Sequence, residues 1–315
     1  MHVKVEDLTG RITRREFGLG MAAAIATAKE SKPQIAITID DFDWKKIPRE
    51  GAERANRQLL DALARHSNLK AAIFVCGEHV DNETGRQLVR TWSDAGHLIG
   101  NHSYSHFSYN DADVSFAKFS DDLLRGEHFI SELPGFQKMF RFPFLKEGET
   151  AAKRDQMRAF LTKHSYSNGH VTIDASDWYY DQRLRARLDQ NPALDPRPYR
   201  DPYLAHLWDR ATYYDGLAQS MTGRTISHTI LLHYTLLNSL FLDAVLTMFE
   251  AKGWKLANAQ TAYQDPVFSN APRIVPAGES LIWAMAKESG KFEGKLRYPG
   301  ETGEYEKDKL DRLGL

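Results

Sequence analysis

Short apolar segments rich in β-branched residues alternate along the chain with longer segments that carry apolar residues at helical spacing. The first short segment, 34–40 (QIAITID), is typical of a buried parallel strand. The next segment, 49–67, places Leu59, Leu60 and Leu63 on one side of a predicted helix. The same patterns predict strands at 70–76, 97–101, 139–142, 170–174, 229–233 and 255–258, and helices at 85–95, 111–133, 150–164, 203–221, 238–252 and 280–287.

Strands and helices alternate in about seven tandem units, which favours an α/β fold with a parallel sheet and outer helices. Both a (β/α) barrel and an open doubly wound sheet fit this pattern. We assign 29–263 to this domain and interpret the long polar segment 179–227 as an insertion. The periodicity fades from about residue 264, so 264–315 form a C-terminal extension, whose charge-rich part 301–311 is typical of a solvated tail.

Residues 1–28 have the features of an export signal. Arg14 and Arg15 precede Phe17, a weakly apolar run covers 18–25, and Ala26-Thr27-Ala28 is typical of a cleavage site. This pattern resembles a twin-arginine signal, so we expect a periplasmic or extracellular protein; the alternative is a short Ala-rich helix on a cytosolic protein. The chain has no apolar run of about 18 residues, so we expect no membrane-spanning helix.

Composition narrows the chemistry. The 315 residues include 41 Lys and Arg against 42 Asp and Glu, so no overall basic field attracts nucleic acid or an anionic membrane. Cys76 is the single cysteine, which excludes an intramolecular disulfide and a thiolate-rich zinc site. Any metal must therefore be bound by carboxylates and by some of the 12 histidines.

A histidine pair and an aspartate pair follow two of the predicted strands, where parallel α/β folds place their sites. His102 and His106 are four residues apart, and on a helical turn both imidazoles would face one ion, although surface pairs also occur by chance at this spacing. Asp40 and Asp41 point to opposite faces of a strand unless the chain turns there. One would then bind a cation and the other act as a base; the alternative is a helix cap or turn. Such a site suits Zn²⁺ better than Mg²⁺.

Other strand ends carry an arginine, a second acidic residue and aromatic residues. Arg141 is placed to pair with the free aspartate, or else forms a structural ion pair at the surface. Asp177 near His233 would keep that imidazole protonated, whereas a single histidine is more often a hydrogen-bonded core residue. Phe144 and Trp178 offer flat surfaces that suit sugar rings and are equally ordinary in a core.

Taken in order, these residues resemble the motifs of the polysaccharide deacetylases, carbohydrate esterase family four. The resemblance covers about residues 34–258, and each motif stands at a predicted strand end. The motifs are Thr38-Ile39-Asp40-Asp41, His102-Ser103-Tyr104-Ser105-His106, Arg141-Phe142-Pro143-Phe144, Asp174-Ala175-Ser176-Asp177-Trp178 and Leu231-Leu232-His233.

The resemblance implies a distorted (β/α)7 barrel and a hydrolase that removes N- or O-acetyl groups from a glycan or amino sugar, acting on carbon–nitrogen bonds other than peptide bonds. A divalent metal, usually zinc, would be bound by Asp41, His102 and His106, and water on that metal would attack the acetyl carbonyl. The resemblance further implies that Asp40 is the general base, held in place by Arg141, and that His233 is the general acid, tuned by Asp177. It also implies that Trp178 forms a wall of the acetyl pocket and that a backbone N–H near Phe144 binds the oxyanion.

The first loop departs from the family pattern, because Phe42 stands where the family has glycine. This change leaves open a catalytically silent glycan-binding barrel. A third function that stays open is another metallohydrolase acting on a small amide or phosphoester. The sequence does not indicate the oligomeric state or the identity of the acetylated substrate.

Overall fold

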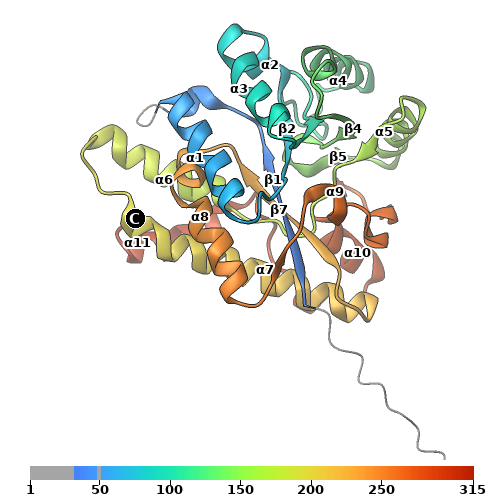
Figure 1. The fold of residues 1–315 in the computed structure, drawn as a ribbon. Coiled ribbons are helices and arrows are strands. Elements are labelled where there is room, and N and C mark those ends of the chain that lie inside the picture. The colour runs from blue at the N-terminus through green and yellow to red at the C-terminus, as the bar shows by residue number, and fades with distance from the viewer. Residues whose placement is uncertain (1–31, 48–50) are drawn as a thin grey trace, which may run out of the picture. The chain divides into compact units, whose positions relative to one another are not determined.

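The computed structural model describes residues 32–47 and 51–315. The predicted export signal, 1–28, lies outside these residues. The main sheet is parallel throughout, in the order β6-β4-β3-β2-β1-β7, and β8 also pairs with β1. Figure 1 shows it curving with helices packed around it. The strands are β1 (Gln34–Asp40), β2 (Ala72–Val75), β3 (Leu98–Asn101), β4 (Phe136–Phe140), β5 (Lys146–Gly148), β6 (Ser167–Asn168), β7 (Ser227–His233), β8 (Lys255–Leu256) and β9 (Ala277–Gly278).

Helices cover the outside of the sheet. Helix α1 packs against α8, and α8 also packs against α6 and α7. The predicted distorted (β/α) barrel is confirmed by this parallel half-barrel with its helices. The helices are α1 (Ala52–Arg65), α2 (Gly77–Val80), α3 (Glu83–Asp94), α4 (Phe116–Ile130), α5 (Ala151–Lys163), α6 (Asp177–Gln190), α7 (Arg200–Thr222), α8 (Leu236–Ala251), α9 (Ala259–Ala262), α10 (Leu281–Ser289) and α11 (Lys307–Arg312).

Strand β1 has a different environment on each face. Ile35, Ile37 and Ile39 belong to the large core under the helices. Ala36 belongs to a separate small cluster, which also contains Phe74 of β2 and alanines of α9. Side chains alternate along a strand, so the residues two and four positions after Ala36, Thr38 and Asp40, lie on the face of Ala36. The interior of the barrel therefore combines small side chains with polar groups.

The predicted strand at 170–174 is wrong. Directly before and within this segment, the described residues form only the short strand β6 and a single bridge between Ile173 and Ile230. Thr172 and Ile173 both direct their N–H groups at the carbonyl of Thr229, at 3.1 and 3.0 Å. Two donors on one acceptor do not continue a regular ladder, so this apolar segment is buried without forming a strand.

The segment 179–227 contains two helices, one of which the sequence analysis did not predict. Helix α7 covers the predicted helix at 203–221. Helix α6 is also present, and its buried residues include Tyr180, Leu184 and Leu188. These side chains are four residues apart, which is a helical signal, although many charged residues surround them.

The C-terminal extension packs against the barrel. Its strand β9 pairs antiparallel with β5, and Leu281 donates its N–H to the carbonyl of Val171 at 2.8 Å. Within the segment expected to be a solvated tail, Leu310 is fully buried and Glu306 is 4% exposed. The charges at 301–311 therefore flank buried anchoring residues, and this expectation is wrong.

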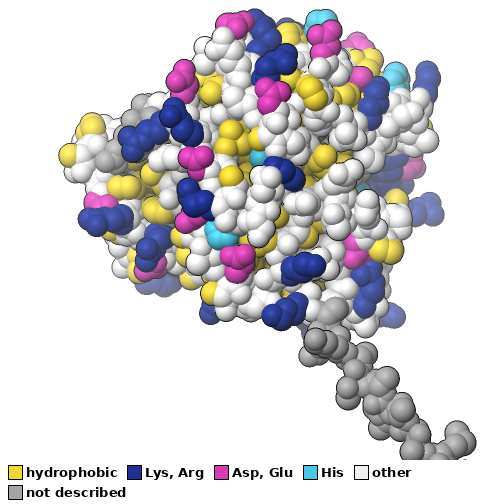
Figure 2. All heavy atoms as spheres, viewed as in Figure 1, with side chains coloured by type: hydrophobic (Ala, Val, Ile, Leu, Met, Phe, Trp, Pro, Cys, Tyr) yellow, Lys and Arg dark blue, Asp and Glu magenta, His cyan; other side chains and the backbone are white. Residues whose placement is uncertain are grey.

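Basic and acidic side chains are interspersed on the face of the molecule shown in Figure 2. This distribution agrees with the net charge of −1. Among residues 32–47 and 51–315, no helix combines the length and the apolar character needed to cross a bilayer.

Candidate active site

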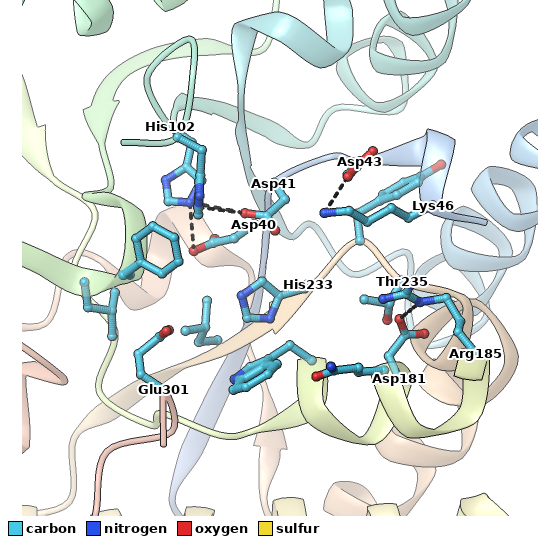
Figure 3. Close-up of a pocket in the computed structure, with 17 residues that line it drawn as sticks. Asp40, Asp41, Asp43, Lys46, His102, Asp181, Arg185, His233, Thr235 and Glu301 are labelled. Carbon is cyan, nitrogen blue, oxygen red and sulfur yellow. Dashed lines mark hydrogen bonds and ion pairs between the residues drawn. The ribbon is translucent and has the colours of Figure 1, made fainter. Parts of the chain in front are cut away.

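The carboxyl ends of β1 and β7 form the floor of a polar pocket. In the register of this pair, Asp40 lies opposite His233. The pocket has a volume of about 540 Å³, and Figure 3 shows side chains from several elements pointing into it. Of the nine predicted site residues, seven line it: Asp40, Asp41, His102, His106, Phe144, Trp178 and His233. The other two, Arg141 and Asp177, lie behind Asp40 and His233.

The chain turns directly after β1. Asp41 has φ 73° and Phe42 has φ 61°, both in the left-handed region. This turn lets both aspartates reach the pocket, as the sequence analysis required. A left-handed conformation costs a residue other than glycine about 1–2 kcal/mol. Phe42 offsets this cost because its ring is 1% exposed and packs 4.5 Å from the ring of Tyr234.

The two histidines lie in an anchored loop rather than on a helical turn. Ser103 and His106 both have positive φ, 65° and 56°. Asp122 of α4 accepts the N–H groups of Tyr104 and Ser105, at 3.1 and 2.9 Å, and the Ser105 hydroxyl at 2.8 Å. The loop therefore has a defined shape, and both imidazoles face the end of β1.

Three predicted ligands converge on one point. Asp41 Oδ1 lies 3.2 Å from His106 Nε2 and 3.5 Å from His102 Nε2. His102 Nδ1 lies 2.8 Å from the carbonyl of Arg141 and must donate to it, so Nε2 of the neutral ring carries a lone pair. Asp41 Oδ1 is buried and accepts no hydrogen bond within the described ranges. A lone pair facing a carboxylate oxygen is repulsive without a cation between them, so these donors fit a divalent metal.

Charge and burial act in opposite directions on these ligands. Burial alone would raise the pKa of Asp41, but the positive charge of His106 foremost, and that of His233, hold it well below its usual range. Burial would lower the pKa of His106, and the Asp41 carboxylate outweighs this effect and raises it. The buried Cys76 sulfur also lies within 4.8 Å of the three ligand atoms. The sequence analysis used this single cysteine only to exclude a disulfide and a thiolate-rich zinc site.

Arg141 fixes Asp40 inside the barrel. Its Nη1 donates to Asp40 Oδ1 at 2.6 Å and to Thr38 Oγ1 at 2.9 Å. Its Nη2 donates to the Tyr263 hydroxyl at 2.8 Å, and the guanidinium lies 4.0 Å from the ring centroid of Phe74. Arg141 is 1% exposed, so this is a buried ion pair rather than the surface pair that was the alternative.

His233 and Asp177 form a second tightly bonded pair. His233 Nδ1 lies 2.7 Å from Asp177 Oδ1, and the backbone N–H of His233 donates to Oδ2, also at 2.7 Å. Asn238 donates to the same Oδ2 at 2.7 Å. Burial would lower the pKa of His233, but Asp177 outweighs it and raises the pKa well above its ordinary value. The imidazolium is therefore stable at neutral pH, with Nε2 as its free donor position.

Aromatic side chains form two walls of the pocket. Phe144 is 39% exposed, and its ring lies 4.5 Å from that of His106. Its φ of 56° is in the left-handed region, at the turn that follows β4. Trp178 follows Asp177 on α6, and its indole N–H donates to the carbonyl of Gly300 at 3.1 Å.

Several residues of the site could not be found from the sequence. Tyr263 holds Arg141 across 122 positions, and Asp122 anchors the histidine loop from within a helix. Neither lies in a motif or after a predicted strand. Asn238 does have a signal, because it is the third residue of a helix that begins after Thr235, close to the strand that carries His233.

Comparison with known proteins finds a family likeness in the first half of the chain. Residues 27–160 match the family model described as polysaccharide deacetylase. Residues 27–160, a little under half of the chain, are therefore similar to the polysaccharide deacetylases. The matched residues include the aspartate pair, both histidines and Arg141.

Two relatives show how far the likeness extends. A peptidoglycan-N-acetylglucosamine deacetylase of Bacillus cereus is 29% identical over 150 residues, 47% of this chain and 47% of that protein. The match thus spans about half of each chain. The solved structure of a mutant of a pseudoenzyme in carbohydrate esterase family four superposes with a TM-score of 0.51 at 19% identity, over 73% of this chain and 67% of that one. This second likeness supports the fold.

Proposed function

We propose that the protein is a metal-dependent hydrolase that removes N- or O-acetyl groups from a carbohydrate. The observation that carries the proposal is the convergence of Asp41, His102 and His106 beside the Asp40–Arg141 pair, with His233 opposite. A base, a cation site and an acid together can catalyse the hydrolysis of an amide or ester.

Asp41 and the Nε2 atoms of His102 and His106 would hold the metal, for which we propose Zn²⁺ because the set combines imidazole with carboxylate. When bound, this ion supplies Lewis acidity that polarises the acetyl carbonyl and lowers the pKa of water. His102 is set for this task by the hydrogen bond from its Nδ1 to the Arg141 carbonyl, which leaves Nε2 unprotonated.

Asp40 and His233 would move the protons. Asp40 Oδ1 is occupied by Arg141, while Oδ2 faces the ligand histidines, 3.8 Å from His102 Nε2. This oxygen is placed to accept a proton from the attacking water. His233, kept protonated by Asp177, would then give its proton to the leaving nitrogen or oxygen.

The walls of the pocket would orient the acetyl group. Trp178 and Leu231 give apolar surface for the methyl group. The backbone at Phe144 would direct an N–H toward the oxyanion. The flat face of Phe144, exposed beside His106, suits a sugar ring.

Acetate release tests the proposal. The purified chain is stripped of metal with a chelator, reloaded with Zn²⁺ and assayed on acetylated chitooligosaccharides. We expect activity only after reloading, and a loss of about 10²–10⁴-fold in Asp40→Asn. Asp40→Asn should still bind the glycan under either reading, so it is the loss of rate that separates an enzyme from a silent glycan-binding barrel. Metal-independent turnover, or release of phosphate from phosphoesters in place of acetate, contradicts the proposal.

We also propose that residues 1–28 direct the folded protein out of the cytoplasm. The support is the arginine pair followed by a weakly apolar segment and a small-residue cleavage site. The substrate would then be a glycan of the cell envelope or its surroundings.

A further inference from the structure

The C-terminal extension reaches the active-site pocket through one tightly held segment. The Gly300 N–H donates to Asp174 Oδ2 at 2.5 Å. The Gly300 carbonyl accepts the Ser176 hydroxyl at 2.8 Å and the indole N–H of Trp178 at 3.1 Å. A Cβ at Gly300 would lie 2.3 Å from Asp174 Oδ1, so only glycine fits this close approach. The residue that follows, Glu301, is therefore held at a fixed place.

Glu301 lines the pocket that contains the proposed catalytic groups. Figure 3 shows its side chain directed into the cavity on the side of His233. Within the described ranges, no side chain or backbone group donates a hydrogen bond to its carboxyl group. Lys46 and Arg185, two basic residues of the same pocket, are paired with Asp43 at 2.8 Å and Asp181 at 2.6 Å.

The environment of Glu301 favours a carboxyl group that can both donate and accept. Burial, followed by repulsion from Asp174, raises the pKa of Glu301 to about 7. A sugar hydroxyl has the same dual capacity. A cationic ligand is less suitable here, because it would be repelled by the protonated His233 nearby.

We propose that Glu301 is a substrate-binding residue, contributed by the C-terminal extension, that hydrogen-bonds a hydroxyl or N–H group of the sugar bearing the scissile acetyl group. The inference rests on the proposed function. Residue 301 lies outside the matched region 27–160, so this contact belongs to the extension and not to the matched part of the site. A partly exposed carboxyl group that lines a pocket, with no hydrogen-bond donor among the described residues, is free to bond a ligand that supplies one.

Two probes separate sugar recognition from acetyl chemistry. N,N′,N″-triacetylchitotriose carries the acetyl group on a hydroxylated ring, whereas 4-nitrophenyl acetate carries it without any sugar donor. The zinc-loaded wild type is compared with Glu301→Ala, with Glu301→Gln, and with Glu304→Ala as an exposed control on the same segment. Zinc content and melting temperature are measured for each variant.

Glu301→Ala removes one hydrogen bond between the carboxyl group and the sugar. We therefore expect kcat/KM for the trisaccharide to fall about 10- to 100-fold in this variant, mainly through a higher KM. Hydrolysis of 4-nitrophenyl acetate should stay within about twofold. Glu301→Gln keeps an acceptor and a donor and should recover most of the loss, and Glu304→Ala should match the wild type.

Equal losses on both probes, or no loss on the trisaccharide, would overturn the assignment of Glu301. If the wild type releases no acetate from either probe, the proposed function fails instead. The binding constant of the trisaccharide, measured by calorimetry, then decides the contact by itself: unchanged affinity in Glu301→Ala overturns it, and weaker affinity supports it.

Discussion

His97 makes the stability of the fold depend on pH, by an amount that the structure allows us to work out. The side chain is 3% exposed, between β2 and β3, and its Nδ1 accepts the N–H of Ala71 at 3.0 Å. Burial, with a smaller effect of the Lys70 charge, lowers the pKa of His97 to about 4. In the unfolded chain the pKa of histidine is about 6.5, so between these two values the unfolded state takes up a proton that the folded state excludes.

Acid therefore destabilises the folded state through this histidine. The stability that depends on neutral His97 is complete above about pH 6.5 and falls as the pH drops toward 4. At pH 5 this difference raises the equilibrium constant for unfolding about 30-fold over its value at high pH, a loss of about 2 kcal/mol in the free energy of unfolding. At or below pH 4 the loss is about 3 kcal/mol.

Urea unfolding of the wild type and of His97→Asn, both in a chelator, tests this value. The amide oxygen of an asparagine side chain is bonded to Cγ, as is Nδ1 of histidine, so it can accept the Ala71 N–H, but it does not titrate. Other ionisable groups cancel in the difference between the two proteins. We expect the wild type to lose about 2 kcal/mol relative to the variant between pH 8 and pH 5. Parallel stability curves would show that His97 is protonated or solvated in the native state and would refute the reasoning.

Two buried charge pairs and the arginine pair near the N-terminus offer three more tests. Asp177→Asn removes the charge that raises the pKa of His233, so the alkaline limb of the pH–rate profile should move to lower pH and kcat should fall about 10²–10⁴-fold; an unchanged limb contradicts the pairing. Arg141→Met leaves the carboxylate at the end of β1 buried without its partner, so urea unfolding at pH 7 should show a loss of about 3–5 kcal/mol, and a loss below about 1 kcal/mol contradicts a buried ion pair. Replacing Arg14 and Arg15 by Lys should retain the protein in the cytoplasm of a bacterial host with a twin-arginine pathway, measured by fractionation; normal export contradicts the signal.

The strands and the motif residues after them were predictable because their signals are local. The run 34–40 shows its burial in adjacent side chains, and in a parallel sheet the residues that end each strand share one edge. Asp40 and His233 therefore meet across two neighbouring strands. These strands are far apart in the sequence: Thr38 of β1 donates its hydroxyl to the carbonyl of Ile230 of β7, 192 positions away. The segment 170–174 shows the limit of this reasoning, because apolar β-branched residues indicate burial but not a regular ladder.

The sequence alone determined which residue types stand at the strand ends, and these types already carry the acid–base and metal-binding chemistry. Only the tertiary structure decided the turn at Asp41, the tautomer of His102 and the position of Glu301. The last two depend on contacts with distant parts of the chain, namely the carbonyl of Arg141 for the imidazole and the tether at Gly300 for the carboxyl group. Hydrophobic periodicity reports whether a side chain is buried, but it does not identify the polar partner, since hydrogen bonds and ion pairs across the barrel produce no pattern among neighbouring residues.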